Sequence, residues 1–338
     1  MIKLYFQDIH YSRRKANFIM VALLYFAEIF YKSVLIIKNL LYDIGLLKEK
    51  KADIYTICVG NLTTGGVGKT PIVKHLANST DKKICIISRG YGAKISNKNV
   101  NVIKDFNKVC FDDGTLCGDE VFQLAKSVGD NVMVLTCADR FKAAQHAKNC
   151  GCEVAILDDG FSNRKLKKDE TILAIDSKMR FGNNHLLPAG PLREPLSQIK
   201  RADCIYLVNK DDSNIDDAIS WVKQFNKPYK ICSMVPKRIY DIKKGADVDP
   251  NGCAIAFCAI GQQTQFFNFA KKYYELSDTI SFEDHHMYTK NDINMLTDRA
   301  NKYNVNTFIT TQKDEAKLKS LIPEGFNFNV LELECKID

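Results

Sequence analysis

Short apolar runs alternate along the chain with longer segments in which apolar residues recur at three- and four-residue spacing. The short runs predict buried strands, and segments such as "DEVFQLAKSV" and "DRFKAAQHAKN" predict amphipathic helices between them. Strands that alternate with helices favour a doubly wound, mostly parallel α/β sheet of the P-loop NTPase type. The strands are expected at residues 54–59, 83–88, 132–136, 154–158, 171–176 and 204–208.

The apolar runs continue after residue 228, in "YKICSMVP", "AIAFCAI", "TISF" and "NTFITT". A chain of 338 residues, of which 46% are hydrophobic, is long enough to bury two cores. We therefore predict a main P-loop domain at residues 51–228, a smaller C-terminal α/β domain at 229–338 and a membrane-associating helical segment at 1–50.

The N-terminal segment begins with the basic residues 13–15, which precede an apolar run. No cleavage site of small residues follows, which argues against a signal peptide, and Glu28 interrupts the run before the roughly 20 apolar residues of a spanning helix. Such a helix either lies in the membrane interface or packs on the sheet as a core helix, and we favour membrane association. On a helical wheel one narrow face collects Glu28, Lys32, Leu35, Asn39 and Asp43.

The stretch "VGNLTTGGVGKTPIV", residues 59–73, joins a predicted strand to a predicted helix. A phosphate-binding loop reads G-x-x-x-x-G-K-[ST], and Thr63 stands here in place of the first glycine. A glycine-rich turn before a helix directs free N–H groups and the helix dipole at an anion, although an ordinary turn has the same composition. Lys69 would bind the outer phosphates of ATP, and the Thr70 hydroxyl would hold Mg²⁺. The expected ATP-binding residues are Thr63, Thr64, Gly65, Gly66, Val67, Gly68, Lys69 and Thr70.

The net charge of +8 suits an anionic substrate or an anionic membrane surface. The twelve cysteines include no C-x-x-C pair, so their spacing gives no support to a zinc site. Because an ATP-using protein belongs in the cytosol, we expect these thiols to be reduced and mostly buried.

The stretch "VAILDDG" ends a predicted strand with Asp158 and Asp159, at the edge where sheets of this type bind ligands. An aspartate at this position would hold Mg²⁺ beside Thr70. Because neighbouring residues of a strand point to opposite faces, the two carboxylates are expected to have different roles. An Asp-Asp-Gly turn without a function is the alternative.

Three further stretches carry groups suited to proton or phosphoryl transfer. Asp119 and Glu120 of "LCGDEVF" form a second acidic pair, although helix N-capping also explains Asp119. Residues 284–288, "DHHMY", place histidines beside a carboxylate, which suits a proton-transfer pair or an ordinary polar surface. The loop "LLPAGPLREPL" carries Arg193, which suits phosphate recognition or a salt bridge with Glu194.

One ordered set of motifs unites these stretches: "VGNLTTGGVGKTP", "SRGYG", "GDE", "ADR", "LDDGF", "FGN", "LLPAGPLREPL", "FEDHHMYT" and "TQKDEAKL". Together, over residues 59–318, they resemble the tetraacyldisaccharide 4′-kinase family, the lipid A 4′-kinases. The loop of that family normally reads G-N-L-T-x-G-G-x-G-K-T-P, so the resemblance makes Thr63 a family feature.

The resemblance implies ATP-dependent phosphorylation of the 4′-hydroxyl of a tetraacylated glucosamine disaccharide 1-phosphate, which gives lipid IVA. It implies ATP and Mg²⁺ as cofactors and attachment to the cytoplasmic face of the bacterial inner membrane, with no nucleic acid and no obligate protein partner evident. The acyl-chain preference and the oligomeric state are left open. The resemblance also implies roles for single residues. Lys69 and Thr70 would bind phosphate and Mg²⁺, and Glu120 and Asp159 would help to hold Mg²⁺, with Asp158 at the same edge. Asp119 would be the base, with His285 or His286 as its partner, and Arg140 and Arg193 would contact phosphate.

Some positions depart from the family pattern. Ser162 stands where members usually carry glutamine, and Asn163 and Arg164 follow where His-Arg or Asn-His is common. Gln312 replaces an acid in the last motif. Two other classes also use a glycine-rich nucleotide loop: a membrane-bound partitioning or switch ATPase, and a P-loop ligase for a soluble metabolite. The ATPases usually carry a second lysine where this chain has Thr64. Turnover of ATP without a lipid distinguishes a switch from a kinase, which needs its acceptor.

Overall fold

The computed structural model describes residues 18–112, 114–210, 214–261, 263–283, 286–319 and 321–338. Spatial contacts divide the chain into two compact units. Unit 1 comprises residues 1–209, 214–232 and 337–338, and unit 2 comprises residues 210–213 and 233–336. The chain passes from one unit to the other within β9 (Tyr229–Asp241) and again within β13 (Asn327–Ile337).

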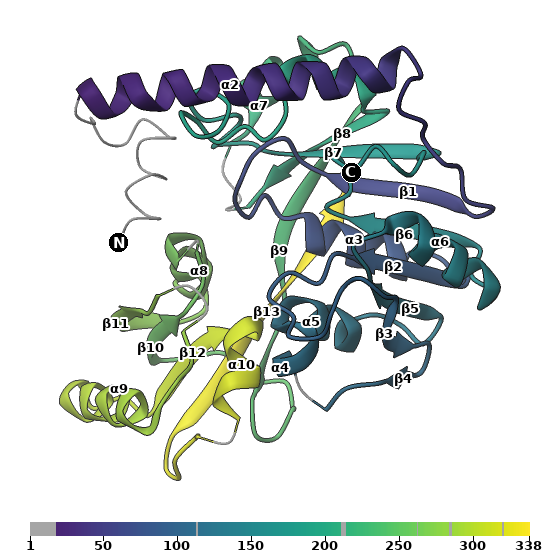
Figure 1. Cartoon of the computed structure of the whole chain (residues 1–338). Helices are drawn as coiled ribbons and strands as arrows, with labels where there is room; N and C mark the ends of the chain where they lie inside the picture. Colours follow the sequence, from purple (N-terminus) through teal and green to yellow (C-terminus); the bar gives the residue numbers. More distant parts are fainter. Residues whose placement is uncertain (1–17, 113, 211–213, 262, 284–285, 320) are drawn as a thin grey trace. The chain divides into compact units, whose positions relative to one another are not determined.

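Unit 1 is built on a mostly parallel sheet with the strand order β8-β7-β1-β6-β2-β5-β3-β4 (Figure 1). β3 pairs antiparallel with β4 and with β5. This arrangement confirms the predicted α/β class, and the predicted strands are within one residue of the observed bounds. These bounds are β1 (Tyr55–Gly60), β2 (Ile84–Ser88), β3 (Asn101–Asp105), β4 (Lys108–Val109), β5 (Val132–Thr136), β6 (Val154–Asp158), β7 (Glu170–Asp176) and β8 (Cys204–Asn209).

Both faces of the unit 1 sheet are covered. Ile87 of β2 packs with Ala143 of α6, whereas the neighbouring Ile86 points to the opposite face and is also fully buried. Strands that are buried on both faces are continuously apolar, which explains why they were predictable from short runs. The helical elements of the unit are α2 (Phe18–Asp43), α3 (Lys69–Asn78), α4 (Gly114–Cys117), α5 (Asp119–Ser127), α6 (Arg140–Asn149), η1 (Leu196–Arg201) and α7 (Asp216–Lys223).

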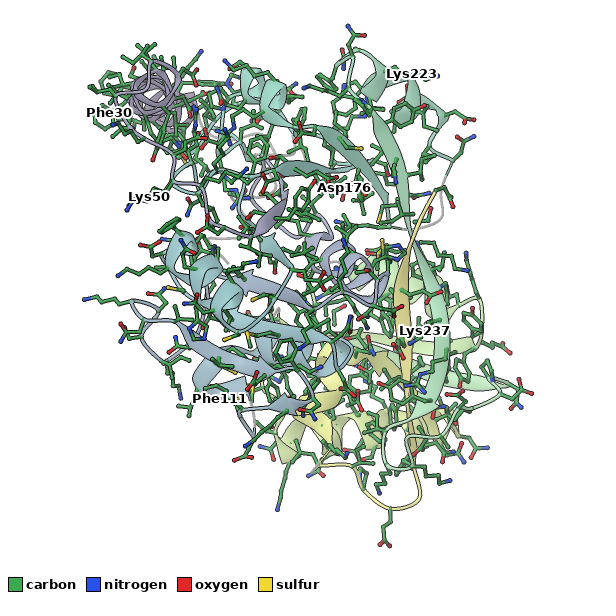
Figure 2. The ribbon with its side chains drawn as sticks, turned by 90° about the vertical axis from the view of Figure 1, so that its right-hand side faces the viewer. Phe30, Lys50, Phe111, Asp176, Lys223 and Lys237 are labelled. Carbon is green, nitrogen blue, oxygen red and sulfur yellow. The ribbon has the colours of Figure 1, made fainter. Side chains whose placement is uncertain are left out.

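Helix α2 is 26 residues long and exposes most of its apolar side chains. Phe26 is 76% exposed and Phe30 is 73% exposed, and Figure 2, which looks along the helix, shows its side chains radiating outward. A core helix would bury these residues, so the core-helix alternative is wrong. By length and composition alone α2 could also cross a membrane, because the helix continues past Glu28 to Asp43.

The polar face predicted for α2 is the side that contacts the rest of unit 1. Leu35 and Asn39 are buried there, and Glu28 and Asp43 make hydrogen bonds to distant residues. Lys32, which the wheel places on the same face, is exposed. The apolar Leu35, which broke the polar stripe in the sequence, therefore helps to dock the helix.

In unit 2 the strands follow the order β11-β10-β12-β13-β9, and β10, β11, β12 and β13 pair in parallel. Phe257, Phe308 and Phe328 form the centre of its core. Asp314 of "TQKDEAKL" is fully buried and accepts hydrogen bonds from Ala259 N and Thr311 Oγ1, so this carboxylate supports the fold of the unit. The other elements are β10 (Cys253–Cys258), α8 (Gln263–Ala270), β11 (Glu275–Ser281), α9 (Lys290–Tyr303), β12 (Thr307–Thr311) and α10 (Gln312–Leu318).

Most cysteines have free thiols, and many of these are buried, as expected. Cys110 in unit 1 and Cys253 in unit 2 are free and exposed. Cys232 and Cys335 are disulfide-bonded, which the scattered spacing of the cysteines did not predict.

Candidate active site

The loop between β1 and α3 turns the chain from a strand end into a helix start. Gly65 and Gly68 have φ angles of 105° and 100°, a region that residues with a side chain rarely adopt. Gly68 directly precedes α3 and has no side chain to cap it. The first N–H groups of α3 and the positive end of its dipole can therefore serve an anion.

A second loop is hydrogen-bonded to this turn. It contains residues 186–196 and is named the proline loop. Thr64 N donates to Pro191 O at 2.7 Å, and Arg193 N donates to Leu62 O at 2.6 Å. Two segments more than 120 residues apart in the sequence are thus joined backbone to backbone. The loop at residues 61–68, named the phosphate-type loop, and the proline loop therefore form one local structure.

Asn61 connects the residues at the centre of the site. Its side chain is fully buried, and its Nδ2 donates to Thr63 O at 2.9 Å. Its Oδ1 accepts a hydrogen bond from Lys69 Nζ at 3.1 Å and another from Arg193 Nη2. Sequence reasoning did not assign Asn61 a role, although it is the asparagine of the "GNL" motif.

Asp159 forms an ion pair with the two cations that also meet at Asn61. Arg193 contacts both of its carboxylate oxygens, at 2.9 and 2.8 Å, and Lys69 Nζ lies 3.6 Å from Oδ1. Although burial acts to raise the pKa of Asp159, the hydrogen bonds from Arg193 and the charge of Lys69 hold it below its usual range. Its backbone has φ of 59°, a left-handed conformation that aspartate tolerates better than most residues.

Asp158 is the last residue of β6 and lies in a different environment from its neighbour. Withdrawal from water raises the pKa of its carboxyl group to about 6, with the charges of Asp159 and Glu120 acting in the same direction and that of Lys69 opposing them. The two aspartates are thus electrostatically distinct.

The second acidic pair lies at the start of α5. Asp119 and Glu120 are both exposed residues of the first helical turn, where the helix dipole favours negative charge. The residue before the helix is Gly118, so Asp119 is not its N-cap and the capping explanation is wrong. Because the charge of Glu120 acts on Asp158, the two acidic pairs belong to the same edge of the unit 1 sheet.

Arg140 begins α6 and is buried. Its Nη1 donates to Cys137 O, and within the described part of the chain its Nε has no hydrogen-bond partner. Burial lowers the pKa of this guanidinium group, and the nearby carboxylate of Asp158 opposes that effect. Arg140 therefore contributes positive charge that acts on Asp158.

The described residues fit Mg²⁺ only as a shared site. Among residues outside the gaps, no group of three or more His, Cys, Asp or Glu side chains is arranged to hold a metal ion alone. Mg²⁺ usually takes one or two carboxylates together with substrate phosphates and water, which suits Thr70, Glu120 and Asp159. The Asp159 oxygens contact Arg193 here, and each retains a further lone pair for a metal.

In unit 2, His285 lies outside the described residues, so its predicted pairing with Asp119 remains a prediction. His286 is described: its Nε2 lies 3.0 Å from Asp292 Oδ2, and its ring stacks on Phe282 with a centroid distance of 4.9 Å. Asp292 also closes the capping box of α9 with Thr289. These contacts give His286 a local role at the start of α9.

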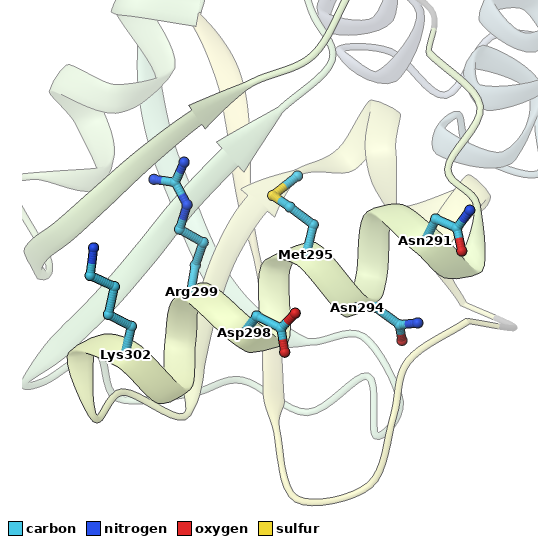
Figure 3. A pocket seen from close by; sticks show the side chains of 6 residues that line it. All are labelled: Asn291, Asn294, Met295, Asp298, Arg299 and Lys302. Carbon is cyan, nitrogen blue, oxygen red and sulfur yellow. The ribbon is translucent and has the colours of Figure 1, made fainter.

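Two surface pockets lie apart from these residues. One of about 440 Å³ follows the outer face of α9, where the side chains of residues 291–302 diverge (Figure 3). The other, of about 660 Å³, lies at the C-terminal end of α2, beside Tyr42 and Arg164. Neither is lined by a predicted site residue, so pocket size does not locate this site.

Comparison with known proteins agrees with the motifs. The family model for tetraacyldisaccharide-1-P 4′-kinase matches residues 20–338. The tetraacyldisaccharide 4′-kinase of Halothermothrix orenii is 31% identical and covers 94% of this chain and 90% of its own. That of Aquifex aeolicus is 33% identical and covers 86% of this chain and 95% of its own.

A solved structure extends the similarity to the fold. The crystal structure of the "apo" form of LpxK from Aquifex aeolicus in complex with ATP matches with a TM-score of 0.74 at 30% identity. The match covers 94% of this chain and 95% of that chain. On this sequence and structural similarity, the chain belongs to the tetraacyldisaccharide-1-P 4′-kinase family.

Proposed function

We propose that this protein transfers the γ-phosphoryl group of ATP to the 4′-hydroxyl of a tetraacylated glucosamine disaccharide 1-phosphate, which gives lipid IVA. The observation that carries the proposal is the family match over residues 20–338, together with the two cations, Lys69 and Arg193, that meet at Asn61 beside the N-terminus of α3. Phosphoryl transfer depends mainly on positioning and on neutralising charge, and this cluster supplies both.

ATP would bind with its phosphates against residues 63–70. Lys69 and Arg193 now neutralise Asp159, and phosphate oxygens would take over part of that pairing. Asn61 would keep both cations in place, because its Oδ1 accepts from each of them. Arg140 and Arg193 would each interact with the negative charge of the phosphates.

Mg²⁺ would be held by the Thr70 hydroxyl, Glu120 and Asp159, with Asp158 at the same edge. When bound, it would neutralise negative charge on the phosphates of ATP. The low pKa of Asp159 keeps that carboxylate ionised, as a metal ligand must be.

Asp119 would act as the base that takes the proton from the sugar hydroxyl, with His285 as its partner. Its exposed position at the start of α5 leaves the carboxylate accessible to a substrate. An isolated aspartate has a pKa near ~4, so a histidine partner would help it to accept or pass on the proton.

The exposed apolar side of α2 would lie in the cytoplasmic face of the inner membrane, where the lipid substrate is found. Phe26, Phe30 and Ile37 would then be buried among acyl chains instead of facing water. We expect Phe26→Ser with Phe30→Ser to weaken cosedimentation with anionic vesicles, while Tyr303→Ser, an exposed aromatic of unit 2, leaves it unchanged. Equal binding by all variants would exclude α2 as the anchor.

The activity is tested with purified protein, ATP labelled in its γ-phosphate and the disaccharide 1-phosphate in detergent. We expect label on the 4′ position and little release of phosphate without the lipid. Lys69→Ala, verified as folded, should lose about 10²-fold or more in kcat because a phosphate contact is removed. ATP hydrolysis that is indifferent to the lipid would support a switch ATPase, and label at another position would contradict the proposed acceptor.

A further inference from the structure

The polar face of α2 is joined to both ends of the proline loop. At one end, Glu28 accepts hydrogen bonds from Leu186 N at 2.7 Å and from His185 Nδ1 at 2.9 Å. At the other end, Lys38 and Asn39 contact Glu194. The helix proposed to contact the membrane therefore also holds the loop that carries Arg193.

Glu194 is the most deeply buried of these residues, with 0% of its surface exposed. Lys38 Nζ lies 2.7 Å from one carboxylate oxygen, and Asn39 Nδ2 donates to the other at 3.1 Å. A carboxylate so far from water requires such partners, since loss of one of them leaves a charge uncompensated. The two contacts span about 155 residues of sequence, so they define a specific tertiary arrangement.

The backbone of the adjacent Arg193 is fixed from two sides. Its N–H donates to Leu62 O in the phosphate-type loop, and its carbonyl accepts from Tyr31 Oη of α2 at 3.0 Å. Burial and the nearby charge of Glu194 raise the pKa of Tyr31, so this phenol stays protonated and remains a donor. The position from which the Arg193 side chain reaches Asp159 is thus set in part by α2.

We propose that Glu194 is a positioning residue: held by Lys38 and Asn39, it fixes the proline loop so that Arg193 meets Asp159 and the phosphates of ATP. Helix α2 is then a support of the reacting centre as well as a membrane contact. This inference rests on the role of Arg193 in the proposed function. Small displacements of a positioned group can cost large factors in rate, so a contact of this kind affects kcat.

Glu194→Gln tests the proposal, with Glu332→Gln as the matched control. Glu332 is likewise a buried glutamate, paired with Lys237 at 3.0 Å and Arg238 at 2.7 Å, but it lies in unit 2. Both variants should unfold at a lower temperature. We expect Glu194→Gln and Lys38→Met to lower kcat by about 10-fold or more, measured on folded protein in detergent, and Glu332→Gln to leave kcat within twofold of wild type.

A double variant separates positioning from a general effect on folding. If Glu194 acts through Arg193, then Glu194→Gln should cost little further activity once Arg193→Ala is present, because residues acting as a unit are not additive. Losses that multiply, or an equal loss in Glu332→Gln, would overturn the positioning role and leave the kinase assignment intact. Normal kcat in Arg193→Ala would instead remove the role of Arg193 and this inference with it.

Discussion

The two acidic pairs of unit 1 share one edge of the sheet but differ in how their charge is balanced. Asp159, which follows β6, is held by Arg193 and Lys69, whereas Asp119 and Glu120 are exposed at the start of α5. In the proposed function, Asp159 would exchange part of this pairing for Mg²⁺ and the phosphates of ATP. The exposed Asp119 would instead accept the proton of the incoming hydroxyl.

The comparison also separates Asp158 from Asp159. The pKa of Asp158 is raised by burial, and that of Asp159 is lowered by its cationic partners. Neighbouring carboxyl groups whose pKa values are shifted in opposite directions by their environments commonly have separate roles. Different roles for the two carboxylates therefore stay a prediction. Strand geometry does not support it, because Asp159 lies beyond β6 with a left-handed backbone, whereas the opposite pKa shifts do.

The largest effect is expected at the exposed pair. Asp119→Ala should lower kcat by about 10²- to 10⁴-fold, the usual contribution of a general base, and leave the KM for ATP and the thermal stability nearly unchanged. His285→Ala should behave alike, and the double variant should be little worse than the more damaged single variant. Steady-state kinetics and thermal unfolding measure this. Losses that multiply, or a loss caused by His286→Ala instead, would contradict the pairing.

A smaller effect, on stability as well as rate, is expected at the paired carboxylate. Asp159→Asn leaves Arg193 and Lys69 without their counter-charge and should lower the free energy of unfolding by about 1–3 kcal/mol. Urea unfolding measures it, with Asp119→Asn as the control that should change by less than about 0.5 kcal/mol. Equal destabilisation of both variants would remove the distinction drawn between the two pairs.

The smallest effect is a dependence on pH at Asp158. Because its folded pKa, about 6, lies above its unfolded value, folding favours the protonated form. Its stabilising contribution is present below about pH 4 and is lost as the pH rises through about 6. The free energy of unfolding of wild type minus that of Asp158→Asn should therefore fall by about 1–2 kcal/mol over this window.

Unfolding is followed in EDTA, so that no metal affects the carboxylates. The matched variant is Asp159→Asn, for which the sign is reversed: a lowered pKa gives stability that is lost on acidification. A difference that rises with pH for Asp158, or slopes of the same sign at both positions, would show that the two environments are not as opposed as described.

The sequence predicted the parts that depend on local pattern. Strands buried on both faces are continuous apolar runs, so β5 and β6 were predicted at their observed bounds. The turn at residues 61–68 follows from its glycines, because a positive φ is needed where the chain enters α3. The family assignment followed from the order of the motifs and is confirmed by the family match.

The parts that were missed depend on contacts between distant residues. Asn61 became recognisable as a centre only when Lys69 and Arg193 were seen to meet at its side chain. Burial of Glu194 depends on Lys38, 156 residues away, and no periodicity reports such a contact. The helical wheel identified the polar face of α2, but it could not show whether the polar or the apolar face packs against the rest of unit 1.

The exposed free thiols have an experimental consequence for the units. Cys110 belongs to unit 1 and Cys253 to unit 2, while many of the other free cysteines are buried. Maleimide dyes react with accessible thiolates, so these two positions are natural attachment points for a donor and an acceptor fluorophore. The efficiency of energy transfer between the two dyes would report the distance between the units. It can be measured before and after ATP and the lipid are added, without any change to the native sequence.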